Sequence, residues 1–304
     1  MSRKTKRRPP EPRDRRWPWA LAVLAIVLPA LWWLFTSRQS PVASVAAPPA
    51  GASAVLSAFR PPDLHALVVA PTDDRTVVFG HHQGMLVSHD GGATWARVSG
   101  ANGDAMGVAI PPGSQTAYAA GHDVFFRSDD GGATWTAMRP SLPGTDIHGF
   151  AASATSPGAF YAYVVNNGLF RSDDGGKTWR SSGSAPGSTM SLAVGKQSGR
   201  DVLFAATMDG VARSRDGGKT WEPVRELADA SHVSAAGDLL GAAAGRRVLV
   251  SSDGGETWQV REFPRGGAAL IAVSPANTKL VYVVTERLEV WRSSDDGLSW
   301  ERAG

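Results

Sequence analysis

The histidine and methionine residues of this sequence have the types and spacing needed for metal chemistry. Five of them recur at nearly regular intervals, at His65, Met106, His148, Met190 and His232. Two more histidines, His82 and His122, recur in the same manner. Imidazole and thioether groups form a soft ligand set that suits copper, and sulfur favours Cu(I). The pattern predicts a site for copper or another transition metal built from these seven residues, centred on His65, His148 and His232.

Acidic residues accompany three of the recurring positions. Asp63, Asp104 and Asp146 stand two residues before His65, Met106 and His148. Carboxylates commonly orient a metal-binding imidazole by accepting a hydrogen bond from its other ring nitrogen, which is the role we expect here. The alternative is structural, because Met and His also fill the crowded inner ends of strands and can point between repeats.

An eight-residue phrase, Ser-x-Asp-x-Gly-x-Thr-Trp, sets the repeat that must position these side chains. It occurs six times, ending at Trp95, Trp135, Trp179, Trp221, Trp258 and, with Ser for Thr, Trp300. Successive tryptophans are 40, 44, 42, 37 and 42 residues apart. A period of this size is typical of architectures in which each repeat is one supersecondary unit.

Each phrase follows a short apolar run and precedes a second extended segment, which predicts a hairpin turn. Its Asp can accept hydrogen bonds from amides of the turn, its Gly tolerates positive φ, and its Trp packs against a neighbouring unit. A calcium loop is the competing interpretation. It is disfavoured because the bidentate Glu of an EF-hand loop and the flanking helices are missing.

The phrase resembles the Asp-box, or bacterial neuraminidase repeat, of sialidase-type β-propellers. The six matches cover residues 88–300. The resemblance implies a β-propeller but no particular activity, because the same box is structural in sialidases, other glycosidases, sortilin-like receptors and the photosystem II assembly factor. Each repeat divides into four short strands, so we predict an all-β, six-bladed propeller of four-stranded antiparallel blades over residues 63–304. Residues 55–59 could add an outer strand.

Counting strands separates the two faces of such a propeller. The innermost strands start, and the second strands turn into the third, at the face opposite the boxes. Loops and strand ends converge on the axis there, so this is the face expected to bind ligands. The seven candidate metal ligands are all predicted to lie on it.

Sialidase chemistry requires three arginines for a carboxylate, a Tyr nucleophile activated by Glu, and an acid/base Asp. Arg60 could bind a carboxylate, but four further arginines precede box serines and so lie near the other face: Arg127, Arg171, Arg213 and Arg292. Every Glu of the propeller follows residue 221, and its four tyrosines lie within second strands, at Tyr118, Tyr161, Tyr163 and Tyr282. We therefore expect no catalysis. The alternative is a sialidase-like glycosyl hydrolase, since Asp63, Asp104 and Asp146 share one rim.

The N-terminal residues differ in composition from the rest of the chain. Residues 1–16 are strongly basic, 17–36 are almost entirely apolar with tryptophans at both ends, and 37–62 are rich in Ala, Pro and Ser. This order predicts a cytoplasmic tail, one transmembrane helix and a tether, with the propeller on the periplasmic or extracellular side. A cleaved signal peptide is the alternative.

Charge and function follow from this division. Residues 1–40 hold 9 of the 31 basic and 2 of the 28 acidic residues, so the remainder has 22 basic and 26 acidic residues, or a net charge of −4. Nucleic-acid binding is not expected. The prediction is a membrane-tethered binding module for a metal ion or an extracytoplasmic protein partner. The alternatives are a protein-binding assembly scaffold and a glycosyl hydrolase.

Overall fold

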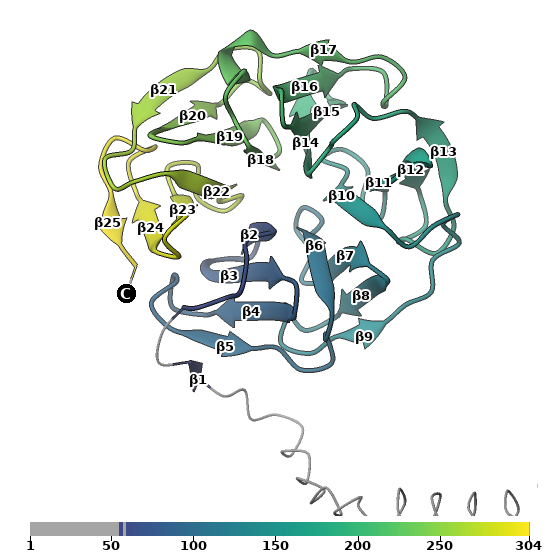
Figure 1. Ribbon diagram of the computed structural model, residues 1–304, viewed down its shortest axis with the longest axis horizontal. Coiled ribbons are helices and arrows are strands. Elements are labelled where there is room, and N and C mark those ends of the chain that lie inside the picture. Colours follow the sequence, from purple (N-terminus) through teal and green to yellow (C-terminus); the bar gives the residue numbers. More distant parts are fainter. Residues whose placement is uncertain (1–54, 57–58, 304) are drawn as a thin grey trace, which may run out of the picture. The chain divides into compact units, whose positions relative to one another are not determined.

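The computed structural model describes residues 55–56 and 59–303. These residues form strands that wind into six sheets around a common axis, and one 3₁₀ turn, η1 (Arg225–Leu227) (Figure 1). The predicted six-bladed, four-stranded antiparallel propeller is confirmed. The predicted tail (1–16) and anchor (17–36) and most of the tether (37–62) lie outside the described residues. Within the described part of the chain, no helix combines the length and apolar character that crossing a membrane requires.

Blades one to three carry the candidate site. Blade one contains β2 (Ala66–Ala70), β3 (Asp73–His81), β4 (Gly84–Ser88) and β5 (Trp95–Arg97). Blade two contains β6 (Asp104–Ala109), β7 (Ala117–His122), β8 (Val124–Ser128) and β9 (Thr136–Ala137). Blade three contains β10 (Ile147–Ala152), β11 (Phe160–Val164), β12 (Gly168–Ser172) and β13 (Arg180–Gly183).

Blades four to six complete the ring. Blade four contains β14 (Ser191–Gln197), β15 (Arg200–Thr207), β16 (Gly210–Ser214) and β17 (Glu222–Pro223). Blade five contains β18 (His232–Ala236), β19 (Leu239–Ala244), β20 (Arg247–Ser251) and β21 (Gln259–Glu262). Blade six contains β22 (Ala268–Val273), β23 (Val281–Thr285), β24 (Val290–Ser293) and β25 (Glu301–Arg302).

The chain closes its ring by packing blade six against blade one. Phe79 and Trp95 of blade one share a buried cluster with Tyr282 of blade six, whose hydroxyl donates to the Asp74 carbonyl at 3.0 Å. Blade one also has a fifth strand, β1 (Val55–Leu56), which pairs antiparallel with β5. The predicted outer strand is therefore confirmed.

The repeated phrase forms one turn six times. In the third blade, Ser172 Oγ donates to Asp174 and accepts the Gly176 amide at 3.0 Å, while Asp174 accepts from the amide and hydroxyl of Thr178. The Thr178 hydrogen bonds are the main cause of a lowered Asp174 pKa, at about 2. Gly176 has φ of +81°, which a residue with a side chain rarely adopts. The phrase is thus a structural turn.

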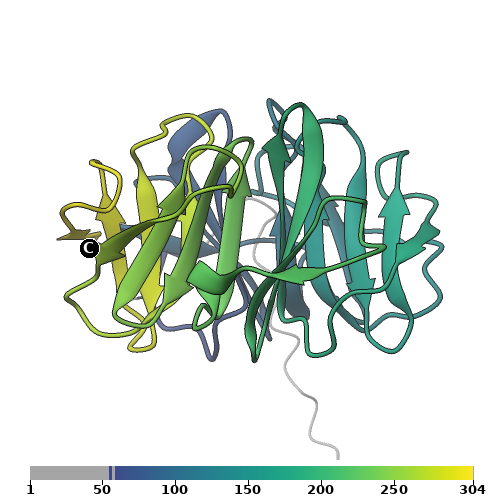
Figure 2. The same cartoon turned by 90° about the horizontal axis from the view of Figure 1, so that it is seen from above.

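Each third strand runs from the turn with the second strand to a box serine, so the boxes lie at one end of the blades. We call that end the box face. The opposite end, which carries the starts of the innermost strands and the turns between second and third strands, is the histidine face. Figure 2 shows the propeller edge-on, with the strands running between its two faces. Both faces lie where strand counting predicts.

Candidate metal centre on the histidine face

The candidate residues come from three adjacent blades. Asp104 begins β6 and pairs directly with His122, which ends β7. His122 also forms an antiparallel bridge with Asp146, just before β10, and so joins blade two to blade three. On blade one, His82 follows β3, and its backbone amide donates to Asp63 at 2.9 Å. Backbone pairing therefore delivers these side chains to one place.

Four histidines and three aspartates alternate across the three blades, and we call them the histidine row: Asp63, His65, His82, Asp104, His122, Asp146 and His148. On blade one, His82 Nδ1 lies 2.8 Å from Asp63 Oδ2. Between blades one and two, His65 Nδ1 lies 2.8 Å from Asp104 Oδ1. Every imidazole in the row has a carboxylate within 3.1 Å.

The tightest part of the row joins blades two and three. His122 Nε2 lies 3.0 Å from Asp146 Oδ1, and His148 Nε2 lies 3.1 Å from the same oxygen. The two Nε2 atoms are 2.9 Å apart. We call these three atoms the ligand triangle. Its side chains are partly open to solvent, with exposed fractions of 39% for His122, 51% for Asp146 and 22% for His148.

Asp104 is the most deeply buried carboxylate of the row. Its side chain is 9% exposed, and its oxygens lie 2.8 Å from His65 Nδ1 and 2.6 Å from His122 Nδ1. No donor in the described part of the chain approaches either oxygen with hydrogen-bond geometry. Burial lowers the pKa of His65, and the Asp104 and Asp63 carboxylates only partly oppose this. Burial therefore favours the neutral form of His65.

The other three predicted ligands lie outside the row. Met106, on the inner strand of blade two, is buried, and Met190 precedes the inner strand of blade four with an exposed fraction of 45%. His232 begins β18 on blade five and is buried, and its Nδ1 lies 3.4 Å from the Ile271 amide. Burial lowers the pKa of His232 to about 4.

A central cavity of about 360 Å³ lies along the axis between the inner strands. His65, Met106, His148 and His232 all line it, as the alignment of inner strands predicted. The close contacts, however, form along the rim and not across the axis. They unite His65 and His148 with His82 and His122, and they include Asp63, Asp104 and Asp146 directly.

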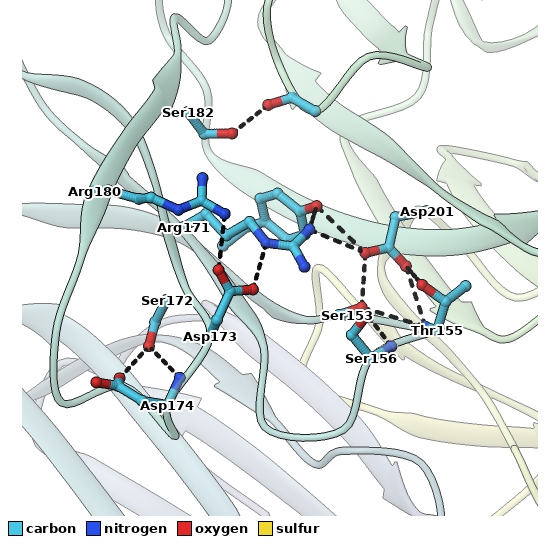
Figure 3. Close-up of polar contacts among 12 residues, drawn as sticks. Ser153, Thr155, Ser156, Arg171, Ser172, Asp173, Asp174, Arg180, Ser182 and Asp201 are labelled. Carbon is cyan, nitrogen blue, oxygen red and sulfur yellow. Dashed lines mark hydrogen bonds and ion pairs between the residues drawn. The ribbon is translucent and has the colours of Figure 1, made fainter.

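A buried polar network on the box face is not predicted by any sequence pattern. Asp201 of blade four accepts from Ser153 Oγ at 2.6 Å and from Thr155 Oγ1 at 2.9 Å, both on blade three (Figure 3). It also accepts from Tyr161, whose hydroxyl contacts the Arg171 guanidinium. No local sequence motif predicts the role of Asp201, because its partners lie 40 to 48 residues away in the sequence.

This network bears on the tyrosine chemistry that a sialidase would need. Burial and the Asp201 charge raise the pKa of Tyr161 to about 12. Burial likewise raises the pKa of Tyr118 and Tyr282. A nucleophilic phenol requires the opposite shift. These tyrosines stabilise blade contacts at the box face, far from the histidine row.

Comparisons with known proteins agree with the fold. The BNR/Asp-box repeat family matches residues 170–181 and 212–223. No curated protein sequence matches the chain. Among solved structures, YCF48 bound to a D1 peptide is similar over 82% of this chain and 84% of its own, at 18% identity and a TM-score of 0.51.

Two GH74 enzymes also resemble the chain. The xyloglucanase from Xanthomonas campestris matches 83% of this chain and 47% of its own, at 15% identity and a TM-score of 0.56. The enzyme from Niastella koreensis matches 82% and 46%, at 15% identity and a TM-score of 0.57. The chain spans about half the length of these enzymes. At such identities the likeness shows the fold alone, and the chain is a six-bladed β-propeller that carries BNR/Asp-box repeats.

Proposed function

We propose that this propeller binds a divalent transition-metal ion at the ligand triangle of His122 Nε2, Asp146 Oδ1 and His148 Nε2. The observation that carries the proposal is the mutual spacing of these atoms, 2.9 to 3.1 Å. Three atoms about 3 Å apart can all lie about 2.0 to 2.1 Å from one point above their plane, which is the bond length that imidazole and carboxylate ligands require.

The number of N–H groups available at this triangle favours a bound ion over hydrogen bonds. Two imidazole nitrogens and one carboxylate oxygen crowd one point, and each neutral imidazole carries only one N–H. The negative charge of the Asp104 carboxylate, 2.6 Å from His122 Nδ1, favours the proton on that nitrogen electrostatically, although the two groups are not aligned as a hydrogen bond. The lone pair of Nε2 is then directed into the triangle, as in carboxylate–histidine–metal arrangements.

The ligand set indicates the metal. Two imidazoles and one carboxylate suit Cu(II), Zn(II) or Ni(II), and Cu(II) binds most tightly in the general affinity order of divalent ions. Copper therefore stays the first candidate. The three protein ligands leave positions open on the solvent side, so the ion can be received from, or passed to, another molecule.

The setting of this function completes the proposal. Residues 17–36 anchor the protein in a membrane, the basic residues before them stay in the cytoplasm, and the propeller works in the periplasm or outside the cell. The apolar length and the charge asymmetry of the sequence support this placement. The protein acts by binding and not by catalysis, which the buried, high-pKa tyrosines support.

Metal content of the purified full-length chain tests the proposal. After loading with Cu(II) or Zn(II) and extensive dialysis, the wild type should retain metal, and His148→Ala should lose at least tenfold in affinity by isothermal titration calorimetry. His89→Ala is the matched control. His89 contacts Thr76 at the box face, so its replacement should not change the affinity for metal. Wild-type protein without stoichiometric metal would refute the proposal.

A second candidate is a protein-binding scaffold, favoured by exposed thioethers on the same face. Met208 has an exposed fraction of 85% and Met190 one of 45%. They lie at the same end of paired strands β14 and β15. Flexible methionines suit adaptable protein contacts. The fold likeness to YCF48, solved with a D1 peptide, is compatible with this role. Crosslinking from a photoreactive residue at position 190 in membranes should trap a protein partner, and adding Met208→Asp should abolish the crosslink.

A further inference from the structure

One ion at the ligand triangle does not account for the environment of the buried Asp104 carboxylate. This carboxylate is nine-tenths buried and faces three imidazole rings. His65 Nδ1 lies 2.8 Å from Oδ1, while His122 Nδ1 and His82 Nε2 lie 2.6 and 3.4 Å from Oδ2. In the described residues, neither oxygen receives a hydrogen bond of acceptable geometry.

A buried carboxylate in this state is costly unless a cation compensates it. Removing an ionised carboxylate from water carries a penalty of several kcal/mol when hydrogen bonds do not replace the hydration. In the described part of the chain, no Lys or Arg forms an ion pair with Asp104. The position is thus suited to a second positive charge.

We propose that a second divalent transition-metal ion binds between Asp104 Oδ2, His82 Nε2 and His122 Nδ1, and that the His122 ring bridges the two ions. This inference rests on the proposed function, because the first ion occupies the other side of the same ring. Asp104 Oδ2 lies 3.4 Å from His82 Nε2 and 2.6 Å from His122 Nδ1, and one possible ligand atom from each of the three residues lies within 4.8 Å of the others. His82, with an exposed fraction of 55% and a position in a turn, has the freedom to close onto the ion.

Asp63 prepares His82 for this role. It accepts the His82 backbone amide at 2.9 Å and holds His82 Nδ1 at 2.8 Å. The carboxylate favours the proton on Nδ1, so the lone pair of Nε2 is directed toward Asp104. Asp63 is therefore a positioning residue, and His82 is the ligand.

The proposed bridge requires one proton transfer. When the second ion binds, the remaining ring proton of His122 passes to solvent, so that both ring nitrogens can bind an ion.

Copper stoichiometry of the full-length chain tests the inference, with Cu(II) in a weakly coordinating buffer as the probe. We expect two copper ions per chain in the wild type and one in His82→Ala. In the wild type the ring-bridged ions should be magnetically coupled, so its integrated electron paramagnetic resonance signal should fall below that of two isolated ions. His82→Ala should show one uncoupled Cu(II). Circular dichroism melting should show that the variant remains folded, because His82 is exposed.

The outcomes separate this inference from the proposed function. No retained copper in the wild type would refute both. One copper in both the wild type and His82→Ala would refute the second ion and leave the first. Two copper ions with the full uncoupled signal would refute the bridge. A second variant, Asp63→Asn, should weaken only the second ion, by roughly tenfold or more, and an unchanged second affinity would contradict the role of Asp63.

Discussion

His122 ends the second strand of blade two, and Asp146 precedes the first strand of blade three, yet the two residues form an antiparallel bridge. Their side chains are also in contact, with His122 Nε2 3.0 Å from Asp146 Oδ1. The main chain of one blade is thereby joined to the next at the point where the candidate metal ligands gather. Metal binding at this point would link two blades.

A metal site in the histidine row and a metal site formed by a ring of His65, His148 and His232 around the axis predict different effects of substitutions that leave the fold intact. His122→Gln removes a corner of the ligand triangle and should lower the affinity for Cu(II) at least tenfold. His232→Gln and Met190→Leu should leave that affinity within about twofold, because neither residue contacts the row. Calorimetric titration of the three variants decides the matter. Loss of metal in His232→Gln would instead support a metal site formed by histidines across the axis.

The buried His232 makes stability depend on pH in a known direction. Its pKa is about 4 in the folded chain, against an ordinary value of about 6.5 when unfolded. Between these values the unfolded state binds more protons, so the free energy of unfolding rises with pH from 4 to 6.5 and falls as the solution is acidified. The full effect is roughly 3 kcal/mol.

Urea unfolding at pH 7.5 and pH 5 measures this contribution. The wild type should lose stability at the lower pH, and His232→Leu should lose less over the same interval, since its side chain does not titrate. His89→Leu, at an exposed site on the box face, serves as the control and should keep the wild-type difference. Equal pH dependence in His232→Leu and the wild type would show that His232 does not titrate as its burial requires.

Asp201 should be among the residues most important for stability. Asp201→Ala leaves the hydroxyls of Ser153 and Thr155 and the amide of Ala154 without their acceptor between blades three and four (Figure 3). Leaving buried donors unpaired costs about 1 to 3 kcal/mol each before relaxation, so we expect a total loss of about 3 kcal/mol or more. Denaturant midpoints give the value.

Asp173→Ala is the matched control for Asp201→Ala. Asp173 lies on the same face and forms ion pairs with Arg171 and Arg180, but its side chain is half exposed. Exposed ion pairs contribute about 0 to 1 kcal/mol. Similar losses in the two variants would mean that the network in Figure 3 is no more than a surface feature.

The blades and their faces could be predicted from the sequence because both follow from local patterns. The box sets each turn, and the count of four strands places His65, His82, His122 and His148 on one face. Which of them meet could not be predicted. Irregular pairing near Asp104 and between Ile147 and Gly149 sets the direction of the side chains that begin these strands. The contacts also depend on how closely adjacent blades approach.

Alignment of the inner strands alone therefore predicts a ring of His65, His148 and His232 around the axis. The same alignment places the turn histidines His82 and His122 on the same face, as additions to that ring. In the structure the close contacts instead join imidazoles at adjacent strand ends, His65 with His82 and His122 with His148. The contacts of Asp104 with the imidazoles of His65 and His122 could not be predicted without knowing the register between β6 and β7.

Gly121 provides the sharpest test of how the fold positions the row without touching any ligand. It precedes His122 in β7, and a Cβ on it would lie 1.8 Å from the carbonyl oxygen of Asp104. Real Cβ atoms do not approach so closely, so Gly121→Ala must push β6 away from β7 and separate Asp104 from His122. We expect a stable propeller to survive, because the other five blades are unaffected, but the affinity for Cu(II) should fall at least tenfold. Gly187→Ala is the control, since a Cβ there meets nothing within 4 Å. Calorimetric titration of both folded variants should separate them, and wild-type affinity in Gly121→Ala would show that the Asp104–His122 pairing does not hold the metal site.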